Sequence, residues 1–82
     1  MRYRCDCCGY YTLRNESDDI CPVCGWQEDI VLREDPDFVG GANYELSLNE
    51  AKKNYKRFGA KNKKCLSRVR KPLLEELPEN NK

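Results

Sequence analysis

Residues 5–26, CDCCGYYTLRNESDDICPVCGW, contain five of the six cysteines of this chain. Cys5 and Cys8 form one Cys-x-x-Cys pair, Cys21 and Cys24 form a second, and twelve residues separate the pairs. This spacing is close to that of four-thiolate zinc sites, in which two knuckles of chain hold one tetrahedral ion. Each pair is followed by a glycine, which permits the positive φ that a tight knuckle needs. The stretch therefore predicts a zinc site with Cys5, Cys8, Cys21 and Cys24 as ligands.

The two remaining cysteines are predicted to lie outside the site. Cys7 directly precedes Cys8 in the chain, so its sulfur cannot easily reach the same ion. We interpret Cys7 as a small, partly buried apolar side chain. The alternatives are a swap ligand or a reactive thiol, because a thiol beside a metal-bound thiolate can have a lowered pKa. Cys65 stands at helical spacing with Leu66 and Val69 and is assigned to the core.

The size of the chain explains why it would need a metal. Its 82 residues are 39% hydrophobic and 35% charged, which describes one small domain with little apolar surface to bury. Domains of this size often depend on a structural metal or on disulfides. The N-terminal residues lack the apolar run of a signal peptide, and no stretch approaches a membrane span of roughly 20 apolar residues. We therefore expect a cytoplasmic protein with reduced cysteines.

An enzymatic role is not expected. The chain has no histidine, the usual general base, and a four-cysteine site leaves no open position at which zinc could activate water. Zinc would then be structural. Several acidic residues could form carboxylate pairs for acid–base chemistry, but their polar, loop-like surroundings favour solvated surface. The acidic residues concerned are Glu16, Asp18, Asp19, Glu28, Asp29, Glu34, Asp35 and Asp37.

The predicted fold is small α+β. Residues 1–33 are expected to form a rubredoxin-like zinc ribbon with short antiparallel strands at Tyr3–Cys5, Tyr10–Leu13 and Ile30–Leu32. A connecting loop containing the Gly-Gly pair would follow at 34–46, where the glycines indicate positive φ or close backbone approach. The side chains expected to pack beside the metal are Tyr10, Tyr11, Trp26 and Ile30.

Residues 47–71 are predicted to be helical and basic. Ser47 and Glu50 form a capping box, Gly59 ends the helix, and apolar residues from Leu48 to Phe58 fall on one face. A second helix is expected over Lys63–Val69. Residues 72–82 form a short acidic tail in which Leu73, Leu74 and Leu77 would be the anchors.

Several motifs together resemble a known family. CDCCGYYTL, ICPVCGW and GGANYELSLNEAKKNYKRFGA are similar in order and spacing to the small cysteine-rich CPCC proteins of bacteria, over residues 5–60. The resemblance implies a metal-binding protein, with Cys5, Cys8, Cys21 and Cys24 as ligands and Cys7 as the third cysteine of the first motif. Asp6 stands where the family has proline, which makes the first knuckle less rigid. The resemblance implies no activity.

Charge is divided unevenly along the chain. Residues 1–51 carry a net charge of −7, residues 52–71 a net charge of +10, and residues 72–82 a net charge of −2. We expect a binding module that recognises a protein partner by charge, as a regulator or as a toxin-neutralising protein of the immunity type. The surface residues considered for such binding are Lys52, Lys53, Lys56, Arg57, Lys61, Lys63, Lys64, Arg68 and Arg70.

Three alternatives remain open at this point. The basic segment 52–71 would also suit nucleic-acid phosphates, although few aromatic side chains are left for stacking on bases. A solvated basic face with no binding role is the plainest interpretation. Finally, the knuckles are similar to those of rubredoxins, so an iron ion that carries electrons is a minor alternative to zinc.

Overall fold

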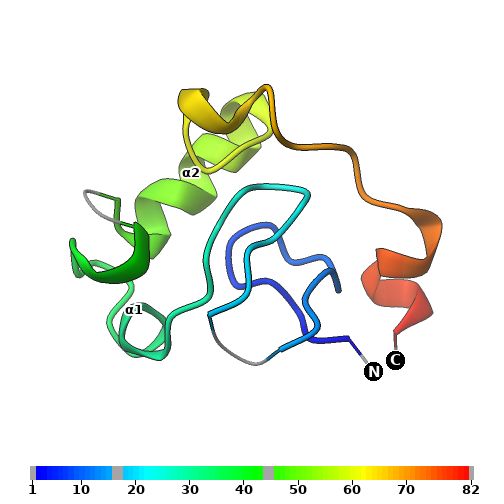
Figure 1. The fold of residues 1–82 in the computed structure, drawn as a ribbon, viewed down its shortest axis with the longest axis horizontal. Coiled ribbons are helices and arrows are strands. Elements are labelled where there is room, and N and C mark those ends of the chain that lie inside the picture. Colours follow the sequence, from blue (N-terminus) through cyan, green and yellow to red (C-terminus); the bar gives the residue numbers. More distant parts are fainter. Residues whose placement is uncertain (1, 16–17, 44–45, 82) are drawn as a thin grey trace.

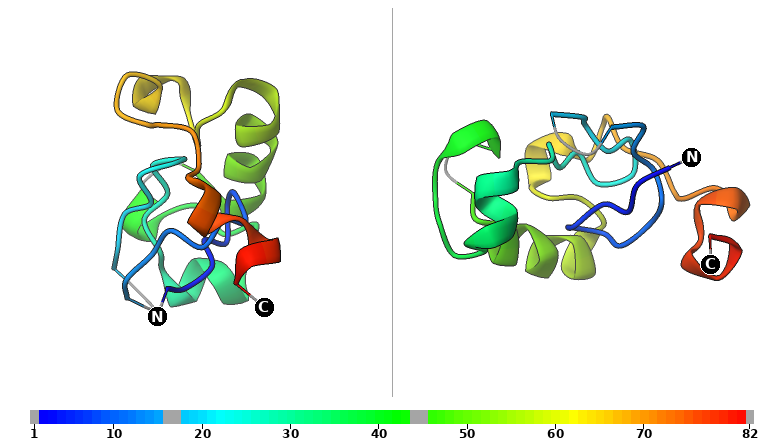
Figure 2. Two further views of the ribbon diagram at one scale, coloured as in Figure 1. Left: turned by 90° about the vertical axis from the view of Figure 1, so that its right-hand side faces the viewer. Right: turned by 90° about the horizontal axis from the view of Figure 1, so that it is seen from below.

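The computed structural model describes residues 2–15, 18–43 and 46–81 (Figure 1). Its α-helices are α1, Ile30–Glu34, and α2, Leu48–Phe58. Single 3₁₀ turns follow at Gly41–Asn43, Lys63–Cys65, Leu74–Glu76 and Pro78–Asn80. The two views of Figure 2 show α2 and the C-terminal turns on different sides of the N-terminal loops. Within these described ranges, no helix is both long and apolar enough to cross a membrane.

The predicted three-stranded ribbon, and with it the α+β class, is wrong. In the described part of the chain, antiparallel pairing is limited to isolated bridges between Tyr3 and Leu13 and between Ile20 and Gln27. The third expected strand, from Ile30, is instead the start of α1. The Asp29 side chain explains this, because it accepts a hydrogen bond from a backbone N–H of the first helical turn and so caps the helix. This local cap outweighs the β propensity of the Ile-Val pair.

The two cysteine knuckles are copies of one turn. In the first, the backbone N–H of Gly9 donates to the carbonyl of Cys5 at 2.9 Å, and in the second that of Gly25 donates to the carbonyl of Cys21 at 2.8 Å. Both glycines have a φ of +85°. The positive φ predicted from the Cys-x-x-Cys-Gly pattern is therefore confirmed, although loops and not strands lead into the knuckles.

The helix predicted between Ser47 and Gly59 is confirmed as α2. The Ser47 hydroxyl accepts a hydrogen bond from the backbone N–H of Glu50 at 3.1 Å, and Gly59 ends the helix with a φ of +89°. Leu48 and Ala51 are buried against the cysteine-rich core. The basic side chains of α2 lie on its opposite, exposed face. Amphipathic spacing thus correctly indicated which face packs on the core.

The second predicted helix, Lys63–Val69, is wrong, because only Lys63–Cys65 form a 3₁₀ turn. Instead of forming a helix, this segment lies alongside the second knuckle and is hydrogen-bonded to it. The backbone N–H of Arg70 donates to the carbonyl of Pro22 at 3.1 Å, and that of Lys61 donates to the carbonyl of Cys24 at 2.8 Å. Tertiary hydrogen bonds therefore replace the helical ones.

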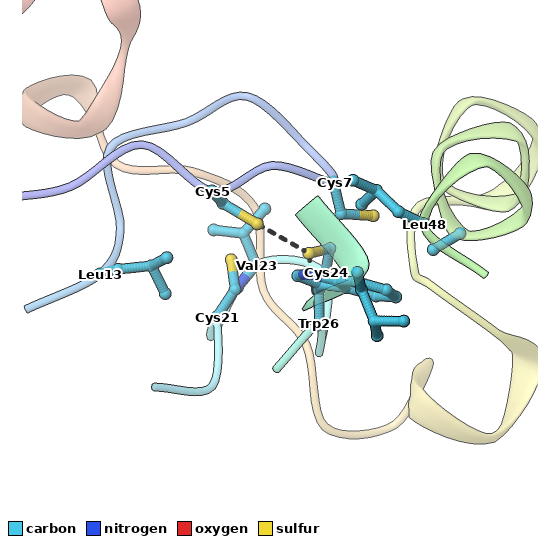
Figure 3. Packing of buried hydrophobic residues seen from close by; sticks show 10 residues of the cluster. Cys5, Cys7, Leu13, Cys21, Val23, Cys24, Trp26 and Leu48 are labelled. Atoms are coloured by element: carbon cyan, nitrogen blue, oxygen red, sulfur yellow. Dashed lines mark hydrogen bonds between the residues drawn. The ribbon is translucent and has the colours of Figure 1, made fainter. Parts of the chain in front are cut away.

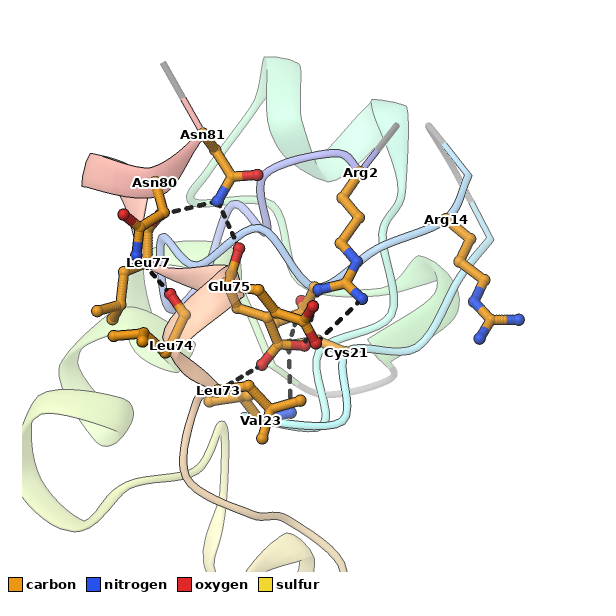
Figure 4. A network of polar contacts seen from close by, with 12 residues as sticks. Arg2, Arg14, Cys21, Val23, Leu73, Leu74, Glu75, Leu77, Asn80 and Asn81 are labelled. Atoms are coloured by element: carbon orange, nitrogen blue, oxygen red, sulfur yellow. Dashed lines mark hydrogen bonds and ion pairs between the residues drawn. The ribbon is translucent and has the colours of Figure 1, made fainter.

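A buried carboxylate anchors the C-terminal tail. Glu76 is 2% exposed, and both of its carboxylate oxygens accept hydrogen bonds from Arg70 at 2.8 Å. Its backbone carbonyl accepts a hydrogen bond from the backbone N–H of Tyr11, which joins the tail to the N-terminal loops. The predicted anchors Leu73 and Leu74 are exposed. Figure 4 shows the accompanying network, in which the Asn80 and Asn81 amides donate to carbonyls of the tail.

Glu76→Gln is expected to loosen the tail. The substitution removes the ion pair with Arg70, so we expect the free energy of unfolding to fall by about 2 kcal/mol, as for a buried charged hydrogen bond. Because Arg70 lowers the pKa of Glu76 below its usual 4.5, this stabilisation is present above pH 4.5 and is lost as the pH falls. Denaturant titration at neutral and acidic pH measures the loss. Glu75→Gln, at an exposed neighbouring carboxylate, is the control, and an equal loss in both variants would contradict the prediction.

Candidate metal centre

The two knuckles bring four cysteine sulfurs together. The Sγ atoms of Cys5, Cys8, Cys21 and Cys24 all lie within 4.8 Å of one another. Cys5, Cys21 and Cys24 are at most 1% exposed, whereas Cys8 is half-buried. Figure 3 shows three of these side chains converging inside the core. These are the four cysteines whose spacing predicted a metal site, and they form a cluster that could hold a metal ion.

The spacing of the sulfurs suits a tetrahedral thiolate site. Zinc–sulfur bonds of about 2.3 Å place the sulfurs of a regular tetrahedron about 3.8 Å apart. The Sγ atoms of Cys5 and Cys24 are 3.5 Å apart, and those of Cys8 and Cys21 are 3.7 Å apart. All four donors are soft sulfurs, which select zinc, iron or copper(I) over calcium or magnesium. The residues present therefore fit one thiophilic metal ion.

The thiols affect one another strongly. Hydrogen bonds with Cys21 raise the pKa of the Cys5, Cys8 and Cys24 thiols. Hydrogen bonds from the other cysteines, chiefly Cys24, lower the pKa of the Cys21 thiol. Four thiolates so close together repel one another, so without a cation the cluster retains protons. A divalent ion would displace those protons and offset the negative charge.

Further hydrogen bonds support the second knuckle. The Thr12 hydroxyl lies 2.9 Å from the Cys21 sulfur in a buried contact, and the backbone N–H of Val23 donates to the same sulfur at 3.4 Å. The backbone N–H of Trp26 donates to the Cys24 sulfur at 3.5 Å. The Thr12 contact was missed by sequence reasoning, because no spacing rule links a residue of the intervening loop to a knuckle sulfur.

The other two cysteines lie outside the cluster. Cys7 is 8% exposed and belongs to the buried core, on the side of Leu48 (Figure 3). This placement agrees with a small buried side chain. Cys65 is only half-buried and contacts the second knuckle, since its Sγ would lie 3.0 Å from a Cβ added to Gly25. It is therefore not the core residue that its helical spacing suggested.

The aromatic side chains expected beside the metal are only partly where the sequence placed them. Trp26 is 1% exposed and packs in the cysteine-rich core. Tyr10 packs on this core and meets Tyr55 of α2 edge to face, with ring centroids 6.4 Å apart. Ile30, however, is 49% exposed, because α1 turns it away from the core. Tyr11 is half-buried.

Glu28, which the sequence analysis assigned to solvated surface, is a buried part of the core. Its side chain is fully buried and accepts a hydrogen bond from the backbone N–H of Asp6, inside the first knuckle, at 2.9 Å. Its second oxygen accepts from Arg33 of α1 at 2.7 Å, and Arg33 also donates to the Asp6 carboxylate at 2.7 Å. Burial, followed by the neighbouring Asp6 carboxylate, raises the pKa of Glu28 to about 7. This network ties α1 to the first knuckle.

The chain matches the model of one protein family over most of its length. A family model described as cysteine-rich CPCC matches residues 3–76, which include both knuckles, both helices and the first part of the tail. The chain belongs to the cysteine-rich CPCC family. No curated protein matches it. Family membership and the cysteine cluster together indicate metal binding.

Asp6 gives this CPCC protein a different support for its first knuckle. A proline in this place would have no backbone N–H. Here the N–H of Asp6 binds Glu28, and the Asp6 carboxylate binds Arg33, so hydrogen bonds hold the knuckle where the family motif has a rigid ring.

Asp6→Pro is therefore expected to destabilise the protein although it restores the motif that names the family. It removes the donor to buried Glu28 and one partner of Arg33, and we expect a loss of about 2 kcal/mol in the free energy of unfolding. Asp6→Ala keeps the N–H and should lose only about half as much. Denaturant titration of both variants checks the prediction, and an Asp6→Pro variant more stable than the wild type would refute it.

The nine basic residues predicted for partner binding are not equivalent. Seven of them are exposed and form no ion pair with the acidic residues that the structure describes: Lys52, Lys53, Lys56, Arg57, Lys63, Lys64 and Arg68. Lys61 donates from Nζ to the Asn43 side chain at 3.0 Å, and Arg70 is bound to Glu76. These last two therefore have structural roles within the fold.

Proposed function

We infer that this CPCC protein is a non-catalytic module built around one structural zinc ion. The observation that carries this proposal is the closed, largely buried set of four thiolate donors on two knuckles. Zinc in such a site has no open position for water or substrate, and its role is to stabilise the fold. Zinc is favoured over iron because most structural sites of this type use zinc, and copper(I) does not need four thiolates.

We further propose that the module acts by binding a protein. Support comes from the segment 29–39, which combines acidic residues with exposed apolar side chains: Ile30 is 49%, Val31 58%, Phe38 44% and Val39 50% exposed. Exposed apolar side chains set among charges are typical of protein-recognition surfaces. A nucleic acid would be repelled by the carboxylates here. The expected partner therefore presents a basic and apolar surface.

Native mass spectrometry of the protein isolated from its own cells at low salt tests both parts. We expect a mass increase of one zinc with loss of four protons, and a second polypeptide bound at one to one. Phe38→Ser should lose the polypeptide and keep zinc, whereas Lys56→Gln, on the exposed face of α2, should keep both.

Other results would overturn the proposal in distinguishable ways. A bound nucleic acid that is lost from Lys56→Gln would assign binding to the basic segment. A red protein with visible absorption and the mass of iron would indicate an electron carrier. A chain without metal would refute the zinc module.

A further inference from the structure

The hydrogen bonds of the cluster are distributed asymmetrically. The second knuckle's sulfurs accept from two backbone N–H groups, and the Thr12 hydroxyl lies 2.9 Å from the Cys21 sulfur, to which it would donate when Cys21 is a thiolate. In the described part of the chain, the sulfurs of Cys5 and Cys8 have hydrogen-bond contacts only with other cysteine sulfurs. Hydrogen bonds to a thiolate withdraw electron density from it and lower its nucleophilicity. The first knuckle therefore holds the more nucleophilic pair.

Solvent access then distinguishes the two sulfurs of that pair. Cys5 is 1% exposed, whereas Cys8 is half-buried. A hollow of about 410 Å³ lies over the first knuckle and is lined by both residues and by Cys7. Cys8 is thus the cluster cysteine that combines access from solvent with a lack of N–H donors.

The same hollow is lined by two cationic side chains and by one carboxylate, that of Asp6, which is paired with Arg33 at 2.7 Å. Arg4 and Lys52 line it, and the Arg4 Nε donates to the carbonyl of Gly9 at 3.0 Å, which holds the guanidinium over the knuckle. Lys52 is exposed on α2 and has no ion pair in the described ranges. Two cations beside a reactive thiolate attract anionic reagents and raise their rate of encounter.

We propose that Cys8 is a modification site for small anionic disulfides, through which the metal centre is opened. This inference rests on the proposed zinc module. The Cys8 thiolate attacks one sulfur of the disulfide; a new S–S bond forms on Cys8 as the bond within the reagent breaks, and the other sulfur leaves with the electron pair as a thiolate. Cys8 is oxidised, the leaving sulfur is reduced, and no proton moves. The ion then keeps three thiolates and is released more readily.

The test uses the zinc-loaded full chain with Cys65→Ser, which removes the half-buried thiol outside the cluster. One equivalent of the anionic disulfide dithiobis(nitrobenzoate) is added at low salt, zinc release is followed with a coloured indicator, and the modified peptide is identified by mass. We expect the mixed disulfide on Cys8, with zinc released in step. Adding Cys7→Ala should leave the rate unchanged, which excludes transfer from a first attack on the neighbouring thiol.

The charge requirement is tested with matched lysines. Lys52→Gln should slow the anionic reagent about threefold and leave the neutral disulfide dithiodipyridine unaffected. Lys53→Gln, whose side chain lines a different hollow, should change neither rate. First modification of Cys5, Cys7, Cys21 or Cys24, or simultaneous modification of all cluster cysteines, would overturn the inference. Zinc in the starting spectrum would still uphold the proposed function in that case. A starting chain without zinc would overturn both.

Discussion

Treating the zinc-loaded protein with a strong chelator such as EDTA is expected to unfold it. The cluster lies inside the hydrophobic core, since Cys5, Cys21 and Cys24 are among the core's buried members. Zinc binding in structural sites is worth about 10–16 kcal/mol, which is as much as the whole stability of a typical domain. In the metal-free chain the four thiols would have no common ligand, and too little apolar burial would remain to hold the loops together.

Trp26 reports this transition directly. It is 1% exposed beside the second knuckle, so its emission should shift to longer wavelength as the chain unfolds, and readdition of zinc should reverse the shift. Cys21→Ser should give the unfolded spectrum even with zinc present. Cys65→Ser is the matched control and should keep the native spectrum. A metal-free chain that retains buried Trp26 and unfolds cooperatively would contradict the prediction.

Replacement of Glu28 is expected to have the second largest effect. Glu28→Ala leaves the backbone N–H of Asp6 without its acceptor, removes one partner of Arg33 and creates a cavity in the core. We expect a loss of about 3 kcal/mol in the free energy of unfolding, from the unmade buried hydrogen bonds and the lost packing. Glu34→Ala, at an exposed carboxylate at the end of α1, should change stability by less than about 0.5 kcal/mol.

The pH dependence of the Glu28→Gln variant checks the cause. The pKa of Glu28 is raised to about 7 from 4.5, so its protonated form is favoured by folding; the corresponding stability is full below pH 4.5 and is lost as the pH rises through 7. Glutamine resembles the protonated acid and does not titrate. The difference in free energy of unfolding, wild type minus variant, should therefore fall by about 2 kcal/mol between about pH 5.5 and pH 8 with zinc in excess. A constant difference would show that burial does not perturb Glu28.

Local patterns in the sequence predicted what local physics controls. The Cys-x-x-Cys-Gly turns form as predicted, because each is closed by a hydrogen bond within five residues and needs only a glycine with positive φ. Helix α2 also forms as predicted, because its N-cap, its C-terminal glycine and its apolar face all lie within 13 residues, Ser47–Gly59. The interpretation of Cys7 as buried agrees with the structure.

Predictions that depended on propensity alone failed. The Ile-Val-Leu run favours a strand, but the preceding Asp29 caps a helix, and Asp29 also accepts a hydrogen bond from the backbone N–H of Ala42 in the following loop. In the segment after α2, backbone hydrogen bonds to the second knuckle take the place of the expected helix. In both segments the deciding partner is a group that propensity does not consider.

The four clustered cysteines and the main helix could both be predicted from the sequence, because both depend on short, fixed spacings and on glycine or capping residues close by in the chain. The burial of Glu28 and Glu76, in contrast, depends on the tertiary structure. Their partners Asp6 and Arg70 lie 22 and 6 residues away, respectively, and a carboxylate can be buried in a core only where hydrogen-bond donors meet it. Likewise, the contact of Thr12 with Cys21 arises only when the loop folds back over the second knuckle. Burial of a polar group depends on what the whole chain places around it, and no local pattern carries that information.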